Sequence, residues 1–167
     1  FGTAATIVLP DFENVLHHYP LTVGEYALGT NQKGMVDTLC REFQMTVAQL
    51  VDQFGLENCS DTVKNMYNRK QLDSWVDVVH MVEPRRDRDY SKMDGKNKPY
   101  ASVYIETDSR HVVSVGGFDE KPFFATRHAR WGSEVWGISP SWMALPEARQ
   151  LNELVKSMDA LAEVKAW

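Results

Sequence analysis

The segment from Gly116 to Leu154 constrains the fold more than any other part of this 167-residue chain. It holds three tryptophans and three phenylalanines, and a short apolar stretch, 122–127, follows its opening Gly-Gly turn. That stretch is typical of an extended segment, and a glycine-marked loop comes after it. Ser139-Pro140 then predicts a helix start, because serine caps helix N-termini and proline at the first helical position loses no hydrogen bond. An extended segment, a loop and a helix therefore follow one another here.

A long amphipathic helix is expected at the end of the chain. Apolar residues from Leu151 to Ala162 recur at three- and four-residue spacing and form one continuous stripe. Pro146 lies in the first turns, which predicts either a kink or a short helical turn over 140–145 before the main helix. The helical pattern runs to Trp167 without a cap, and the chain does not begin with Met. We therefore expect a fragment of a longer polypeptide.

Two short helices are predicted in the middle of the chain. Thr46 and Gln49 have the spacing of a capping box, and Gly55 stands where a C-terminal cap belongs, so a helix is expected over 47–54. A second helix should begin at Ser60 or Asp61 and complete an αα pair.

Strands are predicted on both sides of this helix pair. The first 24 residues, with Pro10 and Pro20, give only a weak strand or loop signal. Segments 26–30 and 35–43 flank an Asn- and Gly-containing turn, which favours a β-hairpin. Further strands are expected from β-branched content. They are 75–82, 100–107 and 111–115. The sequence thus predicts one α+β domain over residues 1–167, with antiparallel β-hairpins, a short αα pair and a long C-terminal amphipathic helix.

Composition narrows the class of function. A hydrophobic content of 43% and a charged content of 25% are typical of a globular domain. The 18 basic and 23 acidic residues leave a net charge of −5, which argues against a general nucleic-acid binder but allows a protein that surrounds DNA without gripping it. The two cysteines, Cys40 and Cys59, are expected to be reduced thiols. No apolar run approaches the roughly 20 residues that span a bilayer.

The sequence offers no residue set for catalysis, a cofactor or a metal. No nucleophile motif surrounds the serines or cysteines, and no glycine-rich phosphate loop occurs. His80 shares a strand face with valines and is expected to be a hydrogen-bonded histidine at the sheet surface. Adjacent His17 and His18 point to opposite faces of an extended chain, so they cannot readily chelate one ion. We therefore predict a protein that is not an enzyme and carries no cofactor.

The loop 83–98 is long and has no apolar periodicity. It holds six basic and four acidic residues, which leaves a small positive excess. Such a loop is typically solvated and paired with itself, and the alternatives are a nucleic-acid site or a contact strip to a neighbouring subunit. The late aromatic residues leave a similar choice open. They form either an internal core packed on the terminal helix or a subunit contact.

The late segment resembles the head-to-tail connecting (portal) proteins of short-tailed, podovirus-type bacteriophages. A weaker likeness covers most of residues 20–162, and His128 and Ile138 depart from the family pattern. The matching motif residues are Gly117-Phe118, Glu120-Lys121-Pro122-Phe123, Arg127, Glu134-Val135-Trp136-Gly137, Ser139-Pro140, Ala144-Leu145-Pro146 and Leu151-Asn152.

This resemblance implies a homo-oligomeric ring, expected to be dodecameric, at one vertex of the phage head. The ring would be a virion component assembled in the bacterial host cytoplasm. Its partners would be the capsid, the terminase and the tail, and double-stranded DNA would pass through its channel without sequence-specific binding or a membrane partner. The present segment would be the wing-like body of the subunit, leading into the stem. A protein-interaction (adaptor) domain unrelated to phage is the main alternative.

Within the portal interpretation, eight residues are candidates for the subunit interface. They are Arg85, Arg86, Arg88, Phe123, Arg127, Trp131, Trp136 and Trp142.

Overall fold

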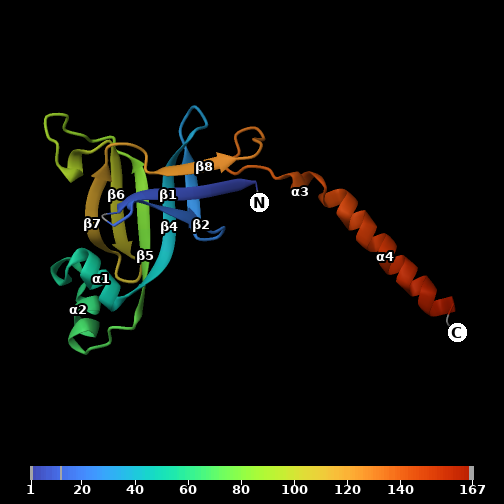
Figure 1. Ribbon diagram of the computed structural model, residues 1–167, viewed down its shortest axis with the longest axis horizontal. Helices are drawn as coiled ribbons and strands as arrows, with labels where there is room; N and C mark the ends of the chain where they lie inside the picture. Colours follow the sequence, from blue (N-terminus) through green and yellow to red (C-terminus); the bar gives the residue numbers. More distant parts are fainter. Residues whose placement is uncertain (1, 12, 166–167) are drawn as a thin grey trace. The chain divides into compact units, whose positions relative to one another are not determined.

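The computed structural model describes residues 2–11 and 13–165, and the chain divides into two compact units. One unit is Ala5–Ala125, and the other joins the residues up to Ala4 with those from Thr126 onward. Strands and helices are both present, so the predicted α+β class is confirmed (Figure 1). The expectation of a single domain over 1–167 stays a prediction.

A five-stranded antiparallel sheet forms the larger part of the first unit. Its strand order is β3-β4-β5-β6-β7, and every neighbouring pair is antiparallel. This confirms the predicted hairpins. The strands are β3 (Tyr26–Thr30), β4 (Val36–Thr46), β5 (Trp75–Pro84), β6 (Tyr100–Glu106) and β7 (His111–Phe118).

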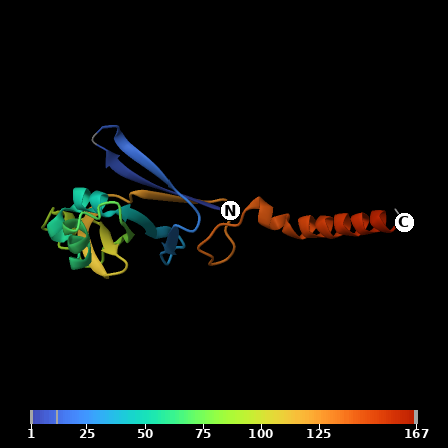
Figure 2. The same cartoon turned by 90° about the horizontal axis from the view of Figure 1, so that it is seen from below.

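A second sheet has three strands in the order β2-β1-β8. They are β1 (Thr3–Asp11), β2 (Val15–Leu21) and β8 (Phe123–Arg127). Strands β1 and β2 form a hairpin that projects from the five-stranded sheet (Figure 2), and β2 is exposed along most of its length. The sequence signal in the first 24 residues is weak because cross-strand pairing, from Ala5 with Leu21 to Asp11 with Val15, defines these strands.

The helix pair follows β4 as predicted, with α1 (Val47–Phe54) and α2 (Asp61–Asn68) joined by a 3-10 turn, η1 (Leu56–Asn58). The capping box of α1 is formed: the Gln49 amide donates to Thr46 Oγ1 at 3.3 Å, and the Thr46 amide donates to Gln49 Oε1 at 3.0 Å. Gly55 ends α1 with φ of 83°, a value that favours glycine. These local signals account for the correct helix prediction.

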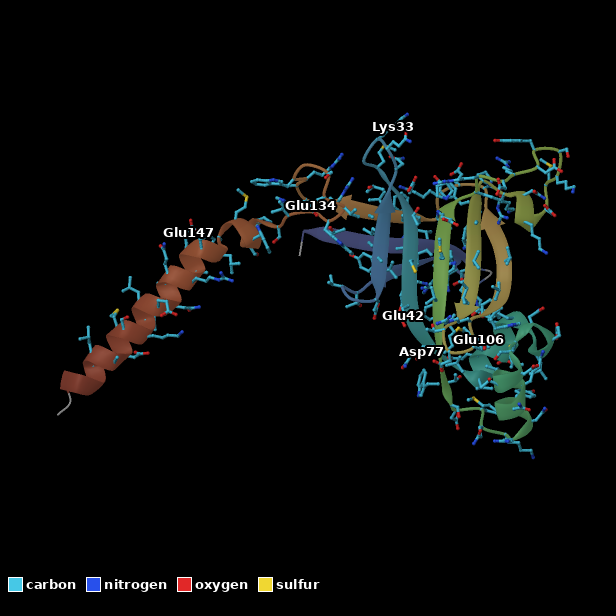
Figure 3. The ribbon with its side chains drawn as sticks, turned by 180° about the vertical axis from the view of Figure 1, so that it is seen from behind. Lys33, Glu42, Asp77, Glu106, Glu134 and Glu147 are labelled. Carbon is cyan, nitrogen blue, oxygen red and sulfur yellow. The ribbon has the colours of Figure 1, made fainter. Side chains whose placement is uncertain are left out.

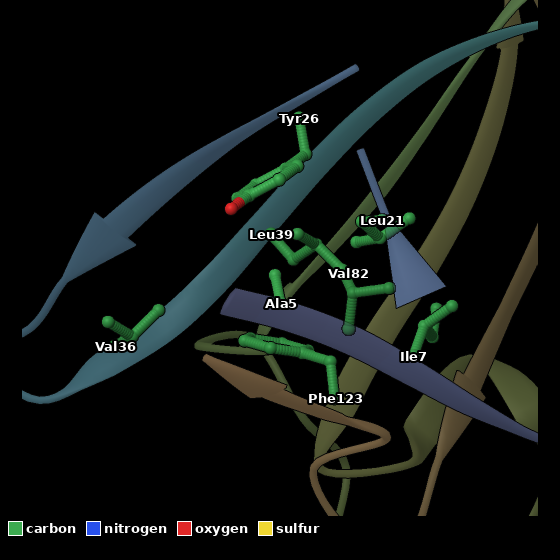
Figure 4. Packing of buried hydrophobic residues seen from close by; sticks show 8 residues of the cluster. All are labelled: Ala5, Ile7, Leu21, Tyr26, Val36, Leu39, Val82 and Phe123. Atoms are coloured by element: carbon green, nitrogen blue, oxygen red, sulfur yellow. The ribbon is translucent and has the colours of Figure 1, made fainter. Parts of the chain in front are cut away.

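Two apolar cores lie on one face of the five-stranded sheet. The first packs the sheet against β1, β2 and β8 around Ile7, Leu39, Val82 and Phe123, all fully buried (Figure 4). The second packs the other end of the same face against α1 and α2. Its fully buried members include Val47, Leu50, Cys59 and Val78.

A polar row separates these two cores. His80 lies here with no exposed area, so the prediction of a histidine at the sheet surface is wrong, although its hydrogen bonding is confirmed. Arg41 Nε donates to His80 Nδ1 at 3.3 Å, and His80 Nε2 lies 2.9 Å from Ser102 Oγ. The imidazole also stacks on Tyr104 with a centroid distance of 3.9 Å. Arg41 and the two cores on either side cover the His80 side chain. The strand pattern alone does not show that this face of the sheet is covered.

The last segment contains two helices. Ser139 caps α3 (Pro140–Met143) by accepting from the Trp142 amide at 3.2 Å, and α4 (Leu145–Lys165) follows. The predicted alternative of a separate short helix before the main one is therefore confirmed. The apolar stripe of α4 is exposed, so an internal core packed on this helix, one of the two alternatives for the aromatic residues, is absent from the described residues.

Candidate subunit-interface surfaces

Two of the three arginines at the start of the long loop donate to backbone carbonyls, one on β7 and one within the loop. Arg85 Nη2 donates to the Gly116 carbonyl at 2.8 Å. Arg88 Nε donates to the Asn97 carbonyl at 2.7 Å, and its guanidinium lies 4.9 Å from the centroid of the Tyr90 ring. Arg86 is exposed, so of the three it offers the most accessible cation to a partner.

Other charges in this loop are also paired locally. Lys92 lies 3.5 Å from Asp89, and Lys98 lies 2.9 Å from Asp119, the residue after β7. A short 3-10 turn, η2 (Gly95–Asn97), adds further order. The loop therefore has one ion pair within itself and one to Asp119, and its other basic side chains either donate to backbone carbonyls or are exposed.

Phe123 differs from the other candidate residues because it has no exposed area. It packs in the first core with Ile7, Leu39 and Val82, and Lys121 Nζ lies 5.3 Å from the centroid of its ring. In the single chain this side chain has a core role, whereas the next residue, Phe124, is 59% exposed. Alternation along β8 accounts for the difference.

The loop after β8 is held by backbone contacts. Ala129 and Ile138 form an isolated antiparallel bridge, in which the Ile138 amide donates to the Ala129 carbonyl at 2.9 Å. Arg127 Nη1 donates to the Val135 carbonyl at 3.3 Å across the base of this loop. Arg127 therefore braces the loop that carries Trp131 and Trp136.

The aromatic residues of this segment face solvent. Trp131 is 73% exposed, Trp142 is 67% exposed and Trp136 is 42% exposed. Apolar residues of α3 and α4 are exposed as well. We call this set the aromatic–helix surface. It comprises Trp131, Trp136, Trp142, Met143, Leu151, Leu154, Val155, Met158 and Leu161. Large exposed apolar side chains gathered in one segment are typical of surfaces that a partner covers.

Burial shifts the pKa of one histidine and of both cysteines. Burial, followed by the charge of Arg41, lowers the pKa of His80 to about 3, so this imidazole is neutral at ordinary pH. Burial raises the pKa of both Cys40 and Cys59, which disfavours the reactive thiolate. Within residues 2–11 and 13–165, no group of three or more His, Cys, Asp or Glu side chains could hold a metal ion.

Sequence reasoning missed two buried polar groups. Arg41 is 9% exposed, and its guanidinium lies 4.3 Å from the Phe43 ring centroid and 5.4 Å from that of Tyr19. Glu106 is 1% exposed and accepts from the Ser60 amide at 3.0 Å. Arg41 alternates with Leu39 and Phe43 along β4, and Glu106 ends β6 two residues after Tyr104. This alternation is the local signal that both side chains face inward.

A helix long and apolar enough to cross a membrane is absent from the part of the chain that the structure describes.

Comparison with known proteins identifies the family of this chain. The family model described as bacteriophage head to tail connecting protein matches residues 1–166. The chain is 46% identical over 153 residues to a protein named "Probable portal protein" in Bordetella phage BPP-1, and 42% identical over 154 residues to the "Portal protein" of Salmonella phage epsilon15. Each match covers 90% of this chain and 28% of the relative, so the chain corresponds to a minor part of those proteins. The chain belongs to the bacteriophage head-to-tail connecting protein family.

Proposed function

We propose that this chain is part of a phage portal subunit, which assembles into a closed ring at one vertex of the head. The aromatic–helix surface carries the proposal, because its tryptophans and its apolar stripe lie open to solvent in the single chain. The family membership and the names of the two relatives give this surface its context.

Helix α4 supports a packed assembly. Its Leu151, Leu154, Met158 and Leu161 are each between 60% and 63% exposed. Most helices in proteins depend on packing of an apolar face, because intrinsic propensity alone leaves an isolated helix only marginally stable. In the proposed ring, α4 leads toward the stem and lies beside helices of the neighbouring subunits.

The work of the ring is mechanical rather than enzymatic. It nucleates head assembly, docks the terminase, lets double-stranded DNA pass during packaging and ejection, and joins the tail. A net charge of −5 suits a body that does not hold phosphate groups. The proposed ring is a dodecamer, a virion component that assembles in the host cytoplasm without a cofactor.

The remaining candidate residues have distinct proposed roles. Arg86 offers an accessible cation for a carboxylate on the next subunit, and Arg85 and Arg88 hold the loop that presents it. Arg127 supports the loop that carries Trp131 and Trp136. Trp142 continues the same apolar surface onto α3.

Assembly of the full-length protein tests this function. Leu154→Glu places a carboxylate inside the apolar stripe, and Ala160→Glu places the same group on the opposite side of α4. We expect rings from the natural protein and from the Ala160 variant by native mass spectrometry, and loss of rings in the Leu154 variant. A natural protein that stays monomeric or dimeric at every concentration and salt would favour an adaptor domain instead.

A further inference from the structure

The five-stranded sheet has an outer face, opposite the two cores. Side chains alternate along a strand, so Arg41, His80 and Tyr104 face the cores, and their neighbours face the other way. Figure 3 views the sheet from this outer side, with Glu42 and Asp77 labelled near its lower end. Within the unit Ala5–Ala125, α1, α2 and the three-stranded sheet pack on the opposite face.

Strand register aligns apolar side chains across this outer face. Cys40 pairs with Met81, Met81 with Val103, and Val103 with Val115. A second row, in which Ile105 pairs with Val79 and with Val112, runs beside the first. We call these two rows the outer apolar strip. Val112 is 47% exposed and Val115 is 41% exposed, while the others are half-buried.

The composition of β5 indicates that this face is covered in the working protein. An antiparallel sheet with one solvated face alternates apolar and polar residues, whereas strands covered on both faces are nearly continuous in apolar residues. Val78 and Val82 of β5 face the cores, and Val79 and Met81 face outward, so the middle of the strand is apolar on both faces apart from the core-facing His80. Asp77 and Glu83 end the outward row. A covering partner explains this pattern.

The margins of the strip have the character of an interface rim. Glu42, Gln44, Asp77 and Glu83 lie on the outward positions around the apolar rows. A hollow of about 370 Å³ opens beside Val103 and Val115, and Glu83, Arg85 and Arg86 line its other wall. An apolar centre with a polar rim is the usual anatomy of a protein–protein interface. The acidic rim disfavours nucleic acid as the occupant.

We propose that the outer apolar strip is covered by a second copy of this chain, the neighbouring subunit in the ring. The inference rests on the proposed portal function. A ring closes through head-to-tail contacts, so each subunit needs two different, complementary patches. The chain exposes two separate apolar surfaces, the outer apolar strip and the aromatic–helix surface, and so meets this requirement.

The reactivity of Cys40 measures whether the outer apolar strip is covered. It lies within the strip and is half-buried in the single chain, whereas Cys59 is fully buried and donates Sγ–H to the Gly55 carbonyl. Gel filtration separates rings of the full-length protein from unassembled subunits, and each fraction is then treated with a maleimide. Peptide mass spectrometry follows modification of Cys40. We expect Cys40 to be labelled at least about tenfold more slowly in rings than in free subunits. Asn65→Cys, on the exposed face of α2, is the matched accessible site and should be labelled equally fast in both.

Substitution gives an independent test. Val103→Glu puts a charge in the strip without entering either core, and Asn65→Glu puts the same charge on α2. We expect the Val103 variant to keep its circular dichroism spectrum and lose rings, and the Asn65 variant to keep both. If the Val103 variant fails to fold, the labelling rate of Cys40 in the natural protein still tests whether the strip is covered.

The outcomes separate the two proposals. Rings that form from natural protein with Cys40 labelled as fast as in free subunits would overturn the inference and leave the portal function standing. Cys40 already protected in the free subunit would also overturn it, because the strip would then be covered within one chain. Natural protein that never forms rings would overturn the portal function, and the inference with it.

Discussion

Acidification should weaken this fold through His80. The imidazole has no exposed area, and its Nδ1 accepts from Arg41 Nε, so the ring proton sits on Nε2 and is donated to Ser102 Oγ. A second proton would abolish the acceptor and place two cations side by side between the cores. Burial and Arg41 accordingly lower the pKa of His80 from 6.5 to about 3.

The sign and size of the effect follow from proton linkage. Above pH 6.5 His80 is neutral in both the folded and the unfolded chain, so it adds no pH dependence. Between pH 6.5 and pH 3 the unfolded chain binds a proton that the folded chain refuses, so the free energy of unfolding falls by about 1.4 kcal/mol per pH unit. From pH 7.5 to pH 4.5 the loss is about 3 kcal/mol.

Urea unfolding of the natural chain and of His80→Gln, followed by tryptophan fluorescence at both pH values, measures this loss. Glutamine can accept from Arg41 and donate to Ser102, but it does not titrate. Carboxylates titrate alike in both proteins, so the difference in their pH response isolates His80. We expect the natural chain to lose about 3 kcal/mol more than the variant. Equal losses would refute the assignment of a neutral, buried imidazole.

Two further predictions concern stability at neutral pH. Glu106→Ala should lower the free energy of unfolding by about 1–3 kcal/mol, because the buried Ser60 amide at the start of α2 loses its acceptor. Urea midpoints measure this loss, and Glu106→Gln is the milder control. Phe123→Ala should cost about 3–5 kcal/mol and Phe124→Ala about 0.5 kcal/mol, because the first ring is buried and the second exposed. Equal effects of the two substitutions in thermal melts would contradict the assignment of Phe123 to the core.

Local sequence signals predicted those elements that local contacts define. Thr46, Gln49 and Gly55 specify α1 within ten residues, and the hairpin turns between strands are equally local. The β1–β2 hairpin was not predicted, because its strands depend on each other and on β8 rather than on their own residues. Non-local pairing of this kind leaves little trace in a single sequence.

Burial of particular side chains was harder to predict than secondary structure. The alternation of valines around His80 does not show whether that face of the strand is covered or open. His80 is buried because two cores pack on the same face of the sheet. The aromatic residues after β8 showed the reverse. Their size suggested either a core or a contact, and the structure leaves Trp131 and Trp142 exposed. A sequence lists the large apolar residues, but packing between distant segments decides which of them are buried.

Electron microscopy of the full-length protein, purified without other phage proteins, tests the central claim most directly. The account predicts closed dodecameric rings with a central opening that double-stranded DNA can traverse. Particles of one or two subunits at every concentration and salt would contradict it, because the exposed aromatic–helix surface would then have no role in ring assembly.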